Sequence, residues 1–134
     1  MPAPCAFDYA VVRVVPRVER GEFLNAGVIV WCLAQDYLAA RVALDVARLR
    51  ALDPHADVEA ISAHLASVPR LCAGDPAAGP IAQLPPKERF HWMVAPRSTV
   101  IQTSPVHTGL CEDPEKALDQ LIRSMVAEPT PVRR

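Results

Sequence analysis

The sequence lacks an excess of charge of either sign. Its 14 lysines and arginines stand against 15 aspartates and glutamates, which gives a formal net charge of −1 at pH 7. A protein that holds nucleic acid electrostatically needs many basic side chains on one face to neutralise phosphates. We therefore do not expect a nucleic-acid partner.

A long apolar run is also missing. The longest one, residues 26–34, is far shorter than the roughly 20 residues that a membrane-spanning helix requires. The N-terminus, MPAPCAFDYA, has no basic region followed by an apolar stretch, so no secretion signal is visible. We expect no membrane association and, by elimination, a cytoplasmic location.

The four cysteines lie far apart, and no C-x-x-C pair is present. Cys32 falls in an apolar strand and Cys72 at the end of an apolar helix stripe, where cysteine behaves as a small hydrophobe. His107 and Cys111 are four residues apart, but zinc signatures combine two ligand clusters and only one is available here. We predict no disulfide, no metal and no other cofactor.

Four segments are predicted to form strands. Residues 9–15, YAVVRVV, are rich in β-branched side chains, and Arg13 shares one face of this strand with Tyr9 and Val11. Residues 25–33 are apolar on both faces and predict a central strand. Residues 38–44 alternate as a half-buried strand does. Residues 98–104 predict the fourth strand, which ends in a turn through Pro105 and Gly109.

The remaining sequence contains signals for helices. Asp45, Asp57 and Asp113 are each placed as N-caps, and Pro114 then occupies the first helical position. A further helical turn is predicted between Pro86 and Val94. The last helix carries the clearest apolar stripe of the chain: Leu118, Leu121, Ile122, Met125 and Val126.

This order of elements predicts one α+β domain over residues 1–134. We expect a mainly antiparallel sheet of about four strands with three to four helices packed on it. The ordered part is predicted to span about residues 7–127, and the tail, residues 128–134, to be frayed.

Three stretches carry a family resemblance: YAVVRVVPRVERGEFLNAGVIVWC, LDVARLRALDP and RFHWMVAPRSTVIQTSPVHTGL. Together they are similar to the bacterial family described as domain of unknown function 3037, over about residues 9–126. The family brings no assigned reaction, ligand or catalytic residue. Members are often encoded beside HipA-like serine/threonine kinases, so the resemblance implies such a kinase as a possible protein partner.

The segment RSTVIQTSPVHTGLCEDP, residues 97–114, is the most polar run and the first candidate site. Guanidinium and hydroxyl donors converge on anionic oxygens, so this run could bind a phosphate or carboxylate. The acidic start of the next helix, with Glu112 and Asp113, would repel such an anion. The alternative is structural: threonines favour strands and Pro105 ends one. The candidate binding residues here are Arg97, Ser98, Gln102, Ser104 and His107.

A catalytic role for these residues has little support. A Ser-His-acid arrangement would need Ser98 or Ser104, His107 and a carboxylate such as Asp113, but no G-x-S-x-G motif is present. The catalytic residues therefore stay unknown.

The loop between the first two strands is the second candidate, since loops on rigid strands often carry binding groups. It contributes Arg17 and Asn25. Arg13, on the preceding strand, is costly to bury without a partner, and Glu22 or Asp8 could supply one. We hypothesise that Arg13, Asn25, Arg97 and His107 face one groove.

Two functions follow from these observations. The first is a small binding or regulatory module that contacts a protein partner such as a HipA-like kinase. The alternative is an enzyme or sensor that acts on a nucleotide or another phosphorylated small molecule through an Arg/His groove. The missing catalytic signature favours the binding module, and the oligomeric state stays open.

Overall fold

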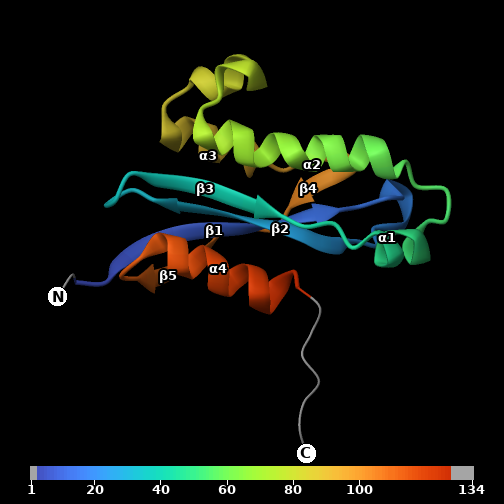
Figure 1. Ribbon diagram of the computed structural model, residues 1–134, viewed down its shortest axis with the longest axis horizontal. Helices are drawn as coiled ribbons and strands as arrows, with labels where there is room; N and C mark the ends of the chain where they lie inside the picture. Colours follow the sequence, from blue (N-terminus) through green and yellow to red (C-terminus); the bar gives the residue numbers. More distant parts are fainter. Residues whose placement is uncertain (1–2, 128–134) are drawn as a thin grey trace, which may run out of the picture.

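An antiparallel sheet runs through the middle of the molecule, with helices on both of its faces (Figure 1). The computed structural model describes residues 3–127, so the frayed tail predicted for residues 128–134 lies outside the described residues. The strands are β1 (Cys5–Val14), β2 (Leu24–Cys32), β3 (Tyr37–Val42), β4 (Ile101–Thr103) and β5 (His107–Cys111). Their order is β3-β2-β1-β4, and β5 also pairs with β1. The predicted α+β fold is confirmed, with a five-stranded sheet in place of about four strands.

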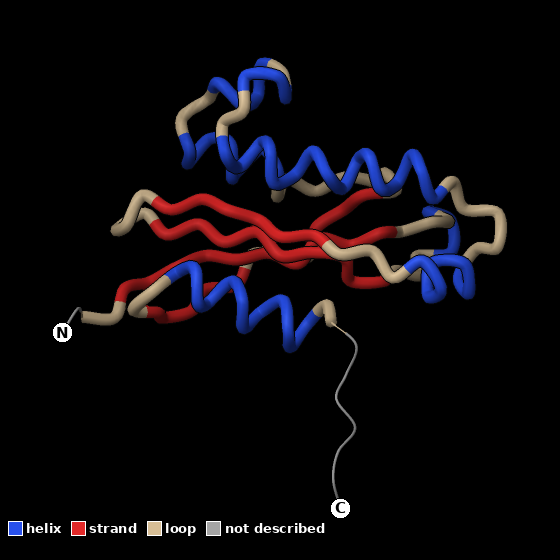
Figure 2. Tube along the Cα trace, viewed as in Figure 1, coloured by secondary structure: helices blue, strands red, loops and turns tan. Residues whose placement is uncertain are grey.

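β2 is buried along nearly its whole length because β1 and β3 flank it and both of its faces are apolar. Asn25 is the one residue of this strand that is only half-buried. The first three strands follow one another antiparallel (Figure 2): a loop over residues 15–23 joins β1 to β2, and a short turn over residues 33–36 joins β2 to β3. The prediction of a central second strand is therefore confirmed.

β4 and β5 together form one interrupted edge beside β1. β4 pairs with the end of β1, where Arg13 lies opposite Gln102, and β5 pairs with its beginning, where Cys5 lies opposite Cys111. The register shifts by one residue between the two strands, and the break falls at Pro105, which cannot donate to a ladder.

Two predictions for this segment were wrong. The strand predicted over residues 98–104 is confined to Ile101–Thr103, and part of the predicted turn is strand β5. Gly109, taken as a turn signal, is a strand residue that lies beneath the ring of Phe7. A Cβ on Gly109 would stand 2.8 Å from that ring. The glycine therefore provides space for a neighbouring strand, which the local sequence does not indicate.

The helices begin and end where the capping signals predict. α1 (Val46–Leu52) and α2 (Val58–Ala73) are capped by Asp45 and Asp57, whose side chains accept the backbone N–H of the third residue along. Gly74, with φ at 71°, ends α2. α3 (Pro86–Met93) and α4 (Pro114–Met125) complete the set.

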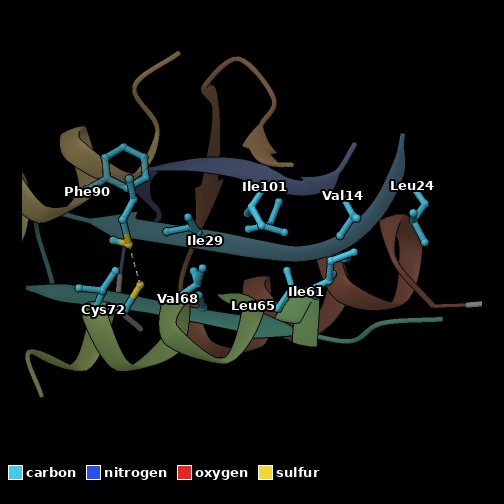
Figure 3. Packing of buried hydrophobic residues seen from close by; sticks show 14 of the residues in the cluster. Val14, Leu24, Ile29, Ile61, Leu65, Val68, Cys72, Phe90 and Ile101 are labelled. Carbon is cyan, nitrogen blue, oxygen red and sulfur yellow. Dashed lines mark hydrogen bonds between the residues drawn. The ribbon is translucent and has the colours of Figure 1, made fainter. Parts of the chain in front are cut away.

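The sheet separates two apolar clusters. α2 and α3 cover one face, which we call the α2/α3 face, and α4 covers the opposite one, the α4 face (Figure 1). On the α2/α3 face, Ile29, Leu65 and Phe90 are almost fully buried (Figure 3). On the α4 face, Leu118 packs against Val30 and its neighbours. Alternate residues of β1 supply both clusters, which is why most of that strand is apolar.

Candidate functional site

Ser104 is a structural residue and not part of a binding surface. It is 3% exposed. Its Oγ accepts the backbone N–H of Val11 at 2.9 Å and donates to the carbonyl of Pro105 at 2.9 Å. The backbone N–H of Ser104 donates to the carbonyl of Val11 at 2.8 Å. The side chain thus replaces the ladder bond that the break at Pro105 removes.

Arg97 lies on the α2/α3 face, stacked on Trp92. The carbon of the guanidinium is 4.1 Å from the centroid of the indole, and Nη2 also donates to the backbone carbonyl of Trp92. Within residues 3–127, no ion pair joins Arg97 to a carboxylate. The guanidinium is held in place by an aromatic ring and one carbonyl, and most of its donors stay available.

Trp92 is exposed, although Phe90, two residues earlier, belongs to the core. Phe90 is 1% exposed, whereas Trp92 is 41% exposed. The two residues are separated by about half a turn of α3, so they face opposite ways. The exposed ring is the feature of the site that sequence reasoning missed; an arginine five residues further along the chain was its only signal.

A small cavity opens beside this pair, between α2, α3 and β4. Its volume is about 90 Å³. The floor is apolar and comes from both the sheet and the helices, including Ile29, Val68 and Ile101. Polar groups lie around it from His64, Ser67, Thr103 and Arg97. An apolar floor with a few polar groups at the rim is the usual composition of a ligand or side-chain pocket.

The predicted residue Gln102 and its neighbour Thr99 make local contacts. Gln102 donates through Nε2 to the backbone carbonyl of Thr99 at 2.8 Å, and Thr99 Oγ1 donates to the carbonyl of Ile101 at 2.8 Å. Ser98 is exposed. Both the glutamine and the threonine therefore close the turn before β4.

Arg13 lies on the α4 face, in a row with Asn25 of β2 and Gln102 of β4. Its guanidinium stacks on the exposed ring of Phe23 at 4.2 Å, and its Nε is buried without a hydrogen-bond partner. The expected ion pair with Glu22 or Asp8 was wrong: Glu22 pairs with Arg20, and Asp8 accepts from Thr108.

Asn25 has a structural partner. Its Nδ2 donates to the backbone carbonyl of Met125 at 3.0 Å. This bond ties the strand to the last turn of α4, whose final carbonyl groups have no partners within the helix. The amide is therefore occupied in holding α4 on the sheet.

His107 lies on the same face as Arg13 but well away from it. It pairs with Tyr9, and the two ring centroids are 5.4 Å apart. Tyr9 and Arg13 are four residues apart along β1, which corresponds to about 13 Å. A single phosphate cannot bridge that distance. The hypothesis of one groove was therefore wrong: Arg13, Asn25 and His107 share a face without converging, and Arg97 lies on the other side of the sheet.

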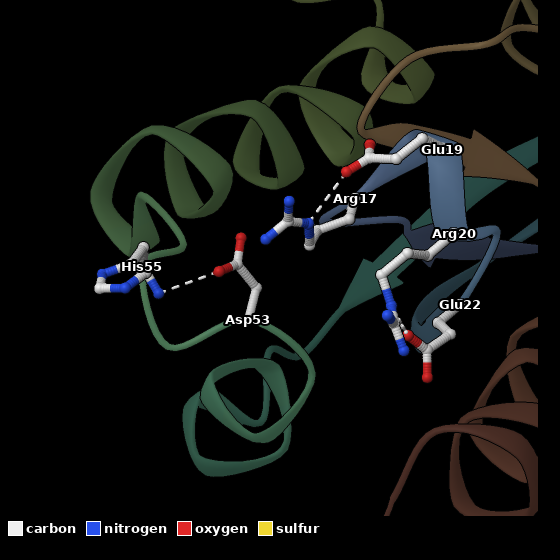
Figure 4. Close-up of polar contacts among 6 residues, drawn as sticks. All are labelled: Arg17, Glu19, Arg20, Glu22, Asp53 and His55. Atoms are coloured by element: carbon white, nitrogen blue, oxygen red, sulfur yellow. Dashed lines mark hydrogen bonds and ion pairs between the residues drawn. The ribbon is translucent and has the colours of Figure 1, made fainter.

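Arg17 lies in the loop between β1 and β2, where alternate charges pair with each other. Arg17 Nε donates to Glu19 at 2.9 Å, and Arg20 pairs with Glu22 (Figure 4). A backbone hydrogen bond and the Arg17 guanidinium lower the pKa of Glu19 below its ordinary value. Such exposed pairs contribute little to stability. The charge of Arg17 is already paired with Glu19, so it is a poor binding group for a partner.

Three cysteines that are distant in sequence meet at the far end of the α4 face. Cys5 and Cys32 have their sulfur atoms 3.8 Å apart, and Cys111 lies opposite Cys5 on β5. Burial and the neighbouring thiols raise the pKa of Cys111 to about 11, which disfavours the reactive thiolate. Within residues 3–127 no group of three His, Cys, Asp or Glu side chains is arranged to hold a metal ion.

The fold and the site together define a small α+β domain with a stacked arginine beside an apolar cavity. A family model described as "Protein of unknown function (DUF3037)" matches residues 9–126. Because the match covers most of the chain, the protein belongs to this family. No curated protein and no solved structure matches the chain. Among the described residues, no helix is long and apolar enough to cross a membrane.

Proposed function

We propose that this domain is a binding module that contacts a partner protein through the cavity beside Arg97. The observation that carries the proposal is the stacked Arg97–Trp92 pair at the cavity, with the guanidinium unpaired among the described residues. Arginine and tryptophan are the residues that most often dominate the energy of protein interfaces. A partially exposed tryptophan beside a pre-positioned arginine is therefore a good centre for an interface.

The size and chemistry of the cavity limit what it accepts. A volume of about 90 Å³ suits one apolar side chain better than a nucleotide. The guanidinium is suited to a carboxylate, which it binds through two parallel hydrogen bonds. The partner segment that fits best carries an apolar side chain next to an acidic one. The HipA-like kinase that family members are often encoded beside is the partner to test first.

Titration calorimetry of the purified kinase with the purified domain tests the proposal. Arg97→Ala and Trp92→Ala are each expected to weaken binding about tenfold or more, as loss of a central interface residue does. Arg50→Ala removes an exposed arginine of α1, away from the cavity, and is the matched control. Unchanged affinity in Arg97→Ala would count against this surface, and no binding at all would remove the kinase as the partner.

The alternative function is a sensor or enzyme for a phosphorylated small molecule, and it requires Arg13, Arg97 and His107 to converge. Their placement on two faces of the sheet speaks against it. A thermal-shift screen with nucleotides and sugar phosphates distinguishes the two, because a ligand at 100 times its Kd stabilises the fold by about 2.7 kcal/mol. The binding module predicts no shift of this size.

A further inference from the structure

Three cysteines from three neighbouring strands lie together on the α4 face. Cys5 begins β1, Cys32 ends β2 and Cys111 ends β5. The Sγ atoms of Cys5 and Cys32 are 3.8 Å apart, and Cys5 Sγ donates to the backbone carbonyl of Cys111 at 3.4 Å. All three are free thiols, as is Cys72, which belongs to the apolar cluster on the opposite face of the sheet. Thiols that are far apart in sequence are thus brought within reach of one another.

The strand register decides which two of these thiols can be joined. Cys5 lies directly opposite Cys111. Opposite residues of antiparallel strands have Cα atoms about 4.5–5.5 Å apart, within the roughly 4.4–6.8 Å that a disulfide spans. Asp8 lies opposite Trp31, so Cys32 is offset from Cys5 by two residues. Such diagonal Cα atoms are about 7–8 Å apart, which is too far for a disulfide unless the backbone moves.

We propose that Cys5 and Cys111 form a disulfide when hydrogen peroxide oxidises the protein. This modification goes beyond the proposed binding of a partner protein and lies on the face opposite the cavity. In the first step the Cys5 sulfur attacks the peroxide: an S–O bond forms, the O–O bond breaks, and the oxygen that leaves takes the thiol proton and becomes water. In the second step the Cys111 sulfur attacks that of Cys5: the S–S bond forms, the S–O bond breaks, and the second water leaves. Two thiols and one peroxide therefore give one disulfide and two waters.

Both sulfur atoms of this pair lie near the surface. Cys5 and Cys111 are half-buried, whereas Cys32 is 0% exposed. Cys111 also lines a surface hollow of about 410 Å³. The exposed side chain of Gln35 donates through Nε2 to Cys5 Sγ at 3.3 Å. A small oxidant can thus reach the proposed pair but not the third thiol.

Burial assigns the order of the two steps. It raises the pKa of the Cys32 thiol, and burial together with the neighbouring thiols raises the pKa of Cys111 to about 11. A thiol that stays protonated reacts slowly with peroxide. Cys5 therefore takes the first step, and Cys111 is the adjacent thiol that converts the sulfenic acid to a disulfide.

Peptide mapping of the full chain tests the proposal, because trypsin places each cysteine on a different peptide: residues 1–13, 21–41, 71–87 and 98–116. The reduced protein is treated with about 1 mM hydrogen peroxide, and the remaining thiols are alkylated under denaturing conditions. We expect peptides 1–13 and 98–116 to be linked, at least about ten times more often than any other pair. Dithiothreitol should separate them, and Cys72 should stay alkylated.

Substitutions identify the role of each thiol. Cys111→Ser should abolish the link and leave Cys5 as a sulfenic acid, which dimedone captures. Cys32→Ala is the matched control, because it removes the third thiol of the same cluster. It should leave the link between Cys5 and Cys111 in place.

Three results would overturn the proposal, and the unsubstituted protein supplies all of them. The first is a dominant link between peptides 1–13 and 21–41, which would join Cys5 to Cys32. The second is a link between Cys5 and Cys111 that occurs only between two chains, seen as a covalent dimer on a non-reducing gel. The third is the absence of any linked peptide after the peroxide treatment.

Discussion

Ser104 and Val11 bond to each other twice, once through the backbone and once through the Ser104 hydroxyl. The backbone N–H of Ser104 donates to Val11 at 2.8 Å, and the hydroxyl accepts the N–H of Val11 at 2.9 Å. The second bond satisfies a buried backbone group at the point where Pro105 interrupts the edge of the sheet. A serine that could be read as a nucleophile therefore maintains a strand pairing.

Replacing this hydroxyl should destabilise the protein. Ser104→Ala leaves the N–H of Val11 buried without a partner, which costs about 1–3 kcal/mol. Urea unfolding measures the loss. Ser98→Ala, at an exposed position of the same segment, should change the free energy of unfolding by less than about 0.5 kcal/mol. Equal effects of the two substitutions would show that the bond to Val11 contributes nothing.

Gly109 should tolerate no side chain while Phe7 lies over it. Gly109→Ala places a Cβ 2.8 Å from the Phe7 ring, and overpacking of this kind costs about 1–3 kcal/mol. The double variant with Phe7→Leu tests the cause, because a smaller side chain relieves the clash. The parent, the two single variants and the double variant form a double-mutant cycle. The two single substitutions should change the free energy of unfolding non-additively, by at least about 0.5 kcal/mol. Additive losses would assign the effect to the strand itself.

Arg89 is predicted to stabilise the protein by binding the C-terminal end of α2. It is 9% exposed, and its Nη1 donates to the carbonyls of Leu71 and Cys72, both at 3.1 Å. Arg89→Met keeps the aliphatic length but removes both charge-assisted bonds, each of which contributes about 1.5–3 kcal/mol. Chemical unfolding should show a loss of about 2 kcal/mol or more. Lys87→Met, exposed on the same helix, is the control and should be near neutral.

The stability of the fold should fall as the pH rises above 9. Burial raises the pKa of the Cys72 thiol to about 12 from its ordinary value of 9.0. Above pH 9 the unfolded chain loses this proton while the folded chain keeps it, so the free energy of unfolding decreases by up to about 1.4 kcal/mol per pH unit. Below pH 9 the thiol contributes no pH dependence.

Comparing the parent with Cys72→Val isolates this effect, because valine fills a similar volume and does not titrate. Unfolding in urea at pH 8, 9 and 10 should give a steeper decline for the parent than for the variant. Parallel curves would mean that the thiol ionises equally in both states.

The helices were predictable because their signals are local. A capping aspartate acts on a backbone N–H two or three residues away, and Asp45, Asp57 and Asp113 all cap where the sequence predicts. The apolar stripe of α4 repeats with the period of the helix itself. Such features need no knowledge of the rest of the chain.

The candidate site was predictable only in part, because its geometry depends on residues far away in sequence. Arg97 was a candidate from its polar surroundings, but its stacking on Trp92 and the cavity depend on the packing of α3 against the sheet. Ser104 was a candidate for the same reason and turned out to bond to Val11, 93 residues away. Polar residue types do not reveal which partner satisfies them.

The sequence by itself determined the class of the fold, the positions of the helices and the existence of the first three strands, since periodicity and capping act over a few residues; β1 begins at Cys5, four residues before the predicted start. Tertiary structure decided the rest. β5 exists because β1 offers it a ladder, and Gly109 is required by a ring from another strand. Strand pairing places Arg13 on the α4 face, and the packing of α3 against the sheet places Arg97 on the opposite one. Long-range strand pairing sets which face each side chain occupies, and no local pattern contains that information.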